Sequence, residues 1–79
     1  MTDTKALQKY VDDSGLKQEF IAKKLGISSN AFARKRDNFF EFKPTEIDTL
    51  CDILHIDTLE ERFAIFFAKE VENNSTREE

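Results

Sequence analysis

A tight turn between two short helical segments is the strongest pattern in this sequence. Where two helices cross at such a turn, the chain needs a small residue at the crossing, a glycine where it reverses, and apolar residues that fix the angle. Ala22 and Gly26 meet the first two needs, and Ile27 and Phe32 meet the third. The pattern therefore predicts two helices packed against each other across a turn at Gly26.

Helical spacing of apolar residues recurs along most of the chain, and only two glycines and one proline interrupt it. Gly15 suits a helix end, and the hydroxyl of Ser28 suits a helix start. The first three expected helices are Thr4–Asp13, Lys17–Leu25 and Ser28–Arg36. A fourth helix is expected to run to about Leu54, with Thr45 as its N-cap and Asp48, three residues later, as the acidic partner of that cap.

The C-terminal region fits two structures. A helix capped at Asp57 or Thr58 would place Phe63 and Phe67 on one face, whereas the alternating apolar residues also suit a short terminal strand over Ala64–Val71. The expected fold class is all-α: a compact five-helix bundle whose fifth segment is open to this strand alternative.

Length and residue types narrow the possible functions. Seventy-nine residues allow one domain, expected over residues 1–72, followed by a polar tail over 73–79 that we expect to be disordered. One cysteine and one histidine are too few for a disulfide or a structural zinc site, so we expect no metal and no cofactor. Cys51 is expected to be a buried apolar filler and His55 a surface or capping residue. The carboxylates follow exposed helical positions, so we expect no enzyme.

Charge is divided unevenly along the chain. Residues 1–36 carry eight Lys/Arg against four Asp/Glu, and residues 37–79 carry four against twelve. Within Lys17–Arg36 the balance is six basic residues to one acidic residue, a local field that attracts phosphates. The acidic half would then face away from a nucleic acid. The longest apolar run, Phe63–Ala68, is far below the ~20 residues that cross a bilayer, and the first residues form no charged-then-apolar leader, so no membrane partner is expected.

The segment around the turn resembles the Cro and phage-repressor helix-turn-helix family. The matching stretch is Gly-Leu-Lys-Gln-Glu-Phe-Ile-Ala-Lys-Lys-Leu-Gly-Ile-Ser over residues 15–28, and Lys43-Pro44-Thr45 continues it at the next helix. The family pattern covers roughly residues 4–56, and the short early-switch regulators of phages that infect Gram-positive bacteria are also similar. This resemblance implies a five-helix bundle whose third helix enters the DNA major groove, in the cytoplasm of a bacterial host cell.

The resemblance also implies roles for individual side chains. Gln18 would contact phosphate and brace the recognition helix, while Ser28, Ser29 and Asn30 would lie at its exposed N-terminal end, with Ser29 and Asn30 facing base edges. Arg34, one turn later, would pair with guanine. The cations expected to contact phosphates are Lys17, Lys35 and Lys43.

Two features depart from the family pattern. Lys35 stands where the family usually buries an aliphatic residue, and the loop before Pro44 is about two residues longer than usual. That loop contains Phe39, Phe40 and Phe42. We expect one of these phenylalanines to fill the space left by the missing aliphatic side chain. The alternative is an aromatic wedge into the minor groove or a protein-binding patch.

The function indicated by the sequence is sequence-specific recognition of double-stranded DNA by a transcriptional regulator. A palindromic operator would require a homodimer, for which Phe63, Phe66 and Phe67 are the candidate contact residues, although all three could instead be core. The alternative function is a protein-interaction module on the same scaffold that modulates another phage regulator, such as a repressor.

Overall fold

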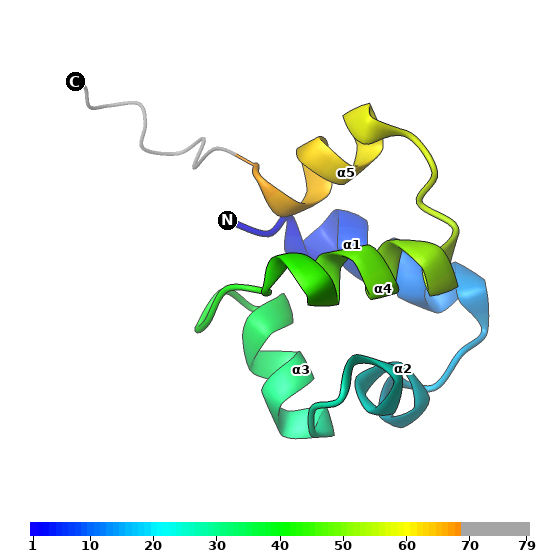
Figure 1. Ribbon diagram of the computed structural model, residues 1–79, viewed down its shortest axis with the longest axis vertical. Coiled ribbons are helices and arrows are strands. Elements are labelled where there is room, and N and C mark those ends of the chain that lie inside the picture. Colours follow the sequence, from blue (N-terminus) through cyan, green and yellow to red (C-terminus); the bar gives the residue numbers. More distant parts are fainter. Residues whose placement is uncertain (69–79) are drawn as a thin grey trace.

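The computed structural model describes residues 1–68, which form five α-helices around one core. The helices are α1 (Thr4–Ser14), α2 (Gln18–Leu25), α3 (Ser29–Arg36), α4 (Pro44–Leu54) and α5 (Leu59–Phe66). In Figure 1, α2 and α3 lie at one end of the molecule and α5 lies at the opposite end, with α1 and α4 between them. The expected all-α bundle of five helices is confirmed.

The first three helices begin and end where their capping residues require. The Asp3 carboxylate accepts a hydrogen bond from the backbone N–H of Ala6 and starts α1, and the Ser28 hydroxyl does the same for Ala31 at α3. Gly15 and Gly26 end α1 and α2 in the left-handed conformation, with φ of 72° and 77°. The predicted boundaries are correct to within one residue.

The start of α4 differs from the prediction. Lys43, rather than Thr45, is the N-cap, and Pro44 is the first helical residue. Proline suits that position because its fixed φ is already helical and its missing N–H has no partner to lose there. Glu46 reaches back to accept a hydrogen bond from the backbone N–H of Lys43 at 2.8 Å, so Glu46 has the capping role that was assigned to Asp48.

The fifth segment is helical as far as Phe66. Its N-cap is Thr58, whose hydroxyl accepts a hydrogen bond from the N–H of Glu61 at 3.1 Å. The strand alternative over Ala64–Val71 is therefore wrong for the part of that range that the structure describes. The predicted tail over 73–79 lies outside the described residues.

The core draws on every helix. The largest fully enclosed side chains are Leu7, Ile21, Phe32, Leu50, Cys51 and Ile56, and Ile65 and Phe66 of α5 belong to the same buried cluster. Burial raises the pKa of the Cys51 thiol, as expected for an apolar filler rather than a nucleophile. His55 is exposed and ends α4 in the left-handed conformation, with φ of 59°, which confirms the capping prediction.

The loop between α3 and α4 contributes one phenylalanine to the core and leaves two in water. Phe42 is 8% exposed and makes edge-to-face contacts with Phe32 at 5.8 Å and Phe66 at 5.7 Å between ring centroids. It thereby joins α3 to α5 through aromatic packing. Phe39 and Phe40 remain 72% and 58% exposed, so one phenylalanine of the three is core. The position of the missing aliphatic residue itself is occupied by the Lys35–Glu46 ion pair rather than by a phenylalanine.

A buried ion pair occupies the position where an aliphatic residue was expected late in α3. The Lys35 ammonium lies 2.6 Å and 2.9 Å from the two carboxylate oxygens of Glu46, and these side chains are only 13% and 7% exposed. Because Glu46 also accepts from the N–H of Lys43, its carboxylate fixes the last turn of α3 to the first turn of α4.

Among residues 1–68, no helix has the length and apolar character that a membrane crossing needs. The same residues contain no cluster of three side chains suited to hold a metal ion.

Breaking the buried ion pair should be costly. Replacing Lys35 by Ala leaves the Glu46 carboxylate buried without its cation, so we expect Lys35→Ala to lower the free energy of unfolding by about 3 kcal/mol, measured by urea denaturation. The control is Lys9→Ala, whose partner Asp13 lies 3.4 Å away and whose side chain is 78% exposed; its loss should stay below about 1 kcal/mol. Similar losses for the two variants would contradict this interpretation.

The same pair predicts how stability depends on pH. Burial raises the pKa of Glu46, but hydrogen bonds from the Lys35 ammonium and the Lys43 N–H outweigh burial and hold that pKa below its ordinary value. Ionised Glu46 therefore contributes stability above about pH 4.3, the pKa of an unperturbed glutamate, and the contribution is lost as the pH falls through the lowered folded pKa.

The measurement is unfolding of the natural chain and of Glu46→Gln from neutral to strongly acidic pH. The difference in stability between the two proteins should shrink as the solution becomes acidic. A difference that stays constant would show that the charge of Glu46 contributes nothing.

Candidate nucleic-acid interface

The outer face of α3 is polar and accessible. Phe32 is the one buried apolar side chain of this helix, whereas Asn30 and Arg34 are exposed. Residues four positions apart lie on the same face of a helix, so Asn30 and Arg34 form a polar pair one turn apart. Ser29 is half-buried at the N-terminal end of the same helix.

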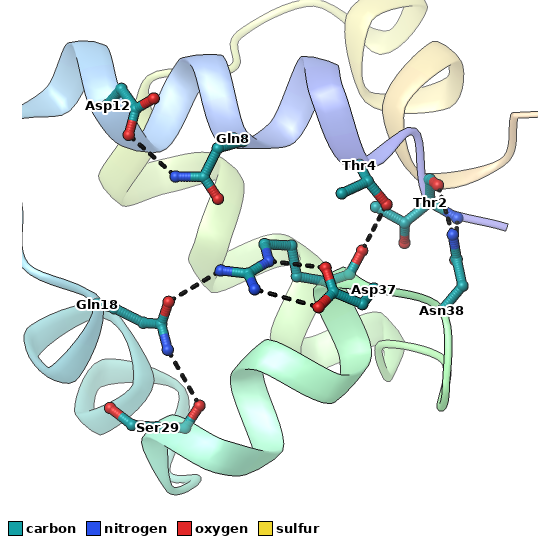
Figure 2. A network of polar contacts seen from close by, with 9 residues as sticks. Thr2, Thr4, Gln8, Asp12, Gln18, Ser29, Asp37 and Asn38 are labelled. Carbon is teal, nitrogen blue, oxygen red and sulfur yellow. Dashed lines mark hydrogen bonds and ion pairs between the residues drawn. The ribbon is translucent and has the colours of Figure 1, made fainter.

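Gln18 braces α3 at both of its ends. Its side-chain Nε2 donates to the carbonyl oxygen of Ser29 at 3.2 Å, and its Oε1 accepts from Nη1 of Arg36 at 2.9 Å. Figure 2 shows Gln18 reaching from α2 to the start of α3. Gln18 therefore makes the contacts with α3 that a brace requires, and its phosphate contact stays a prediction.

Arg36 is committed to contacts within the fold. Its Nε and Nη2 donate to the two carboxylate oxygens of Asp37 at 3.0 Å and 3.2 Å, and these hydrogen bonds hold the pKa of Asp37 below its ordinary value. The Thr4 hydroxyl also donates to the carbonyl oxygen of Arg36 at 2.9 Å. The last turn of α3 is thus attached to both α1 and α2.

Asn38 fixes the chain directly after α3. It adopts the left-handed conformation with φ of 72°, and the N–H of Phe39 donates to the carbonyl oxygen of Arg34 at 2.8 Å, as in a Schellman helix end. The Asn38 side chain accepts from the N–H of Thr2 at 2.7 Å and donates to the Thr2 carbonyl oxygen at 2.9 Å (Figure 2). The end of α3 is therefore tied to the N-terminal segment.

Several cations remain at the surface after these contacts are made. Lys17 and Lys43 are exposed N-cap residues of α2 and α4. Lys23 and Lys24 are exposed at the end of α2, and the Lys24 ammonium lies 5.4 Å from the centroid of the Phe20 ring. Together with Arg34, these lysines keep the α2–α3 end of the molecule basic.

The structure separates the predicted site residues into two groups. Lys35 was expected to contact phosphate. That expectation is wrong, because its ammonium is bound by the buried Glu46 carboxylate and is not accessible. The residues that the structure leaves at or near the surface are Lys17, Gln18, Ser28, Ser29, Asn30, Arg34 and Lys43.

The three phenylalanines proposed for dimerisation also divide. Phe66 is 5% exposed and belongs to the core, whereas Phe63 and Phe67 are 64% and 54% exposed and their rings stack at 5.5 Å. The alternative that all three are core is wrong, and Phe66 leaves the set of candidate contact residues.

Two residues that matter for this site were missed from the sequence. Glu46 is among the carboxylates that we expected at exposed helical positions, although a glutamate two positions after a proline is the arrangement of a helix start with Pro at the first position. Asn38 carried a weaker signal, since asparagine tolerates the left-handed conformation but occurs in many other settings. Its bonds to Thr2 join residues 36 positions apart, which no local pattern encodes.

No family model, curated protein or solved structure matches this chain. The function is therefore argued from the site itself.

Removing the brace should loosen α3. Gln18→Ala leaves the Arg36 guanidinium and the Ser29 carbonyl without this partner, and we expect a loss of about 1–2 kcal/mol in the free energy of unfolding. Gln8→Ala is the matched control, because Gln8 makes its one side-chain hydrogen bond to Asp12 within the exposed face of α1. That variant should lose less than about 0.5 kcal/mol. Equal losses in urea denaturation would show that Gln18 is not a brace.

Proposed function

We propose that this protein is a transcriptional regulator of phage-repressor type that reads double-stranded DNA with α3 in the major groove. The observation that carries the proposal is the division of α3 into two faces. Its inner side is held by Phe32, by the Lys35–Glu46 pair and by Gln18, while its outer side presents Asn30 and Arg34 to solvent. A helix fixed in this way presents polar side chains in a set geometry, as direct readout requires.

The two exposed side chains suit base recognition. Asn30 can make two hydrogen bonds to adenine and Arg34 can make two to guanine. They are four residues apart, or about 6 Å along the helix, which is close to two base-pair steps. We therefore assign the two residues to positions about two base pairs apart within one half-site, with Ser28 and Ser29 beside them.

Phosphate contacts would come from the cations around α2 and α3. Lys17 and Lys43 stand at helix N-termini, where the helix dipole adds to the attraction for an anion. The acidic residues are concentrated in the second half of the chain, and α5 lies at the far end from α3 (Figure 1). The proposed DNA face is thus separated from much of the negative charge. As a regulator of phage-repressor type, the protein would act in the bacterial cytoplasm.

Selection of duplexes from a random DNA pool at two salt concentrations tests this proposal. We expect an enriched motif and an affinity that falls steeply with salt, because phosphate contacts release counterions. Recovery of no enriched sequence would reject the proposed function.

Arg34→Ala should separate base reading from general attraction to DNA. We expect a loss of about 1–3 kcal/mol on the selected site with relaxed specificity at one base pair, and little change on unrelated duplexes. Lys17→Ala should instead weaken binding on all sequences and reduce the salt slope by about one. Lys9→Ala on α1 is the control and should leave both quantities unchanged. Equal losses for Arg34→Ala on all sequences would remove its base-reading role.

Homodimerisation belongs to this proposal as its second step. Two copies on a palindromic operator would read half-sites about 34–36 Å apart, and Phe63 and Phe67 are the exposed phenylalanines of α5 that could meet in such a pair. A second candidate function, interaction with another protein such as a phage regulator, is favoured by the same observation.

A further inference from the structure

A chain of polar contacts joins the end of α3 to its start through the side chain of Gln18. Nε and Nη2 of Arg36 donate to the two carboxylate oxygens of Asp37 at 3.0 Å and 3.2 Å. Nη1 of the same guanidinium donates to Oε1 of Gln18 at 2.9 Å, and Nε2 of Gln18 donates to the Ser29 carbonyl oxygen at 3.2 Å. In Figure 2 these contacts run from Asp37 to Gln18 and on to Ser29.

The two neighbours of Gln18 allow its amide only one orientation. A guanidinium can only donate a hydrogen bond, and a peptide carbonyl oxygen can only accept one. If the amide turned over, Nε2 would face the Nη1 donor of Arg36 and Oε1 would face the Ser29 oxygen, so both contacts would become repulsive. The amide nitrogen is therefore kept at the start of α3 and the amide oxygen at its last turn.

Arg36 is itself held in place. Asp37 binds it through two parallel hydrogen bonds, which fix the plane of the guanidinium and leave Nη1 for Gln18. The Thr4 hydroxyl donates to the backbone carbonyl oxygen of Arg36 at 2.9 Å. The Arg36 side chain is 20% exposed, so little of it is accessible to an external partner. Its donors are used on Gln18 and Asp37 instead.

Gln18 keeps one donor for a partner outside the fold. Its Nε2 carries two protons, and Ser29 is the one acceptor that this nitrogen has among residues 1–68. Gln18 is half-buried at the first position of α2, directly after the exposed Lys17. A hydrogen bond from a cation to Oε1 polarises the amide, which makes its N–H groups better donors to an anion.

We propose that Arg36 and Asp37 are positioning residues for DNA binding, which keep the free Nε2 proton of Gln18 at the start of α3, where a phosphate beside Lys17 accepts it. This inference rests on the proposed function and adds to it two residues that do not touch DNA themselves. Without them the amide would turn, and its oxygen would repel the phosphate in part of the population.

The test uses the full 79-residue protein, the selected duplex and an unrelated duplex. Arg36→Ala/Asp37→Ala leaves the net charge unchanged and should weaken binding to both duplexes about fivefold. The salt slope should not change, because a neutral amide releases no counterion, whereas Lys17→Ala should lower it by about one. The matched control is Arg62→Ala/Asp48→Ala, which removes the Arg–Asp pair between α4 and α5 and should leave binding unchanged.

A double-mutant cycle shows whether the pair acts through Gln18. In a Gln18→Ala background, Arg36→Ala/Asp37→Ala should weaken DNA binding by less than about twofold further, because the amide that the pair orients is already absent. A further fivefold loss would show that the pair acts on DNA by another route. Amide NMR spectra of each variant check that it is folded before its affinity is measured.

The orientation of the amide can be measured without DNA. In the natural chain, the Nε2 protons of Gln18 should give nuclear Overhauser contacts to Ser29, at the start of α3. In Arg36→Ala/Asp37→Ala these contacts should weaken as the amide turns, while the backbone amide shifts of Asn30 and Arg34 stay close to those of the natural chain. Unchanged contacts would show that Arg36 does not orient the amide.

Two further results separate this inference from the function on which it rests. Duplex binding that Arg36→Ala/Asp37→Ala leaves unchanged, or weakens with a salt slope lower by about one, would overturn the inference alone; the second result would mean that Arg36 contacts phosphate directly. Absence of duplex binding by the natural chain would reject the proposed function, and the phosphate contact of Gln18 with it.

Discussion

The buried pair of Lys35 and Glu46 sets the geometry on which the rest of the molecule depends. An ammonium and a carboxylate enclosed in a small core are tolerated only if each finds a partner, and here the carboxylate finds two, the Lys35 ammonium and the N–H of Lys43. The 2.6 Å contact between the Lys35 ammonium and the Glu46 carboxylate thus ties the last turn of α3 to the first turn of α4.

The helices themselves could be predicted from the sequence because their causes are local. Each helix is determined by signals that lie within eleven residues or fewer. These signals are the caps at Ser28 and Thr58, the glycines at positions 15 and 26, and the apolar spacing over a few turns. The start of α4 failed for a related reason. Thr45 is a good N-cap by residue type, but Pro44 at the first helical position and Glu46 at the third together outcompete it.

The site was less predictable than the fold, since polar residues have alternative uses that the sequence does not rank. Lys35, Arg36 and Arg34 are three neighbouring cations with the same local propensity. In the structure, Lys35 binds Glu46 and Arg36 binds Asp37 and Gln18. Arg34 remains exposed to solvent. Only the position of each side chain around the helix, together with partners up to 18 residues away, distinguishes them. Charge counting therefore located the basic region correctly and overestimated how many of its cations are accessible.

The two surfaces on which function is proposed lie at opposite ends but share one support. The N–H of Asp3 donates to the carbonyl oxygen of Ile65 at 2.6 Å, and Thr2, one residue earlier, is held by the side chain of Asn38 at the end of α3. The N-terminal segment therefore bonds both to the last turns of α5 and to the residue that terminates α3. These bonds use backbone groups and the side chain of Asn38. They therefore fix the position of α5 relative to α3 without using side chains of either outer face. One chain of this size can thus present a basic polar helix and an acidic apolar one without the two surfaces competing for the same residues.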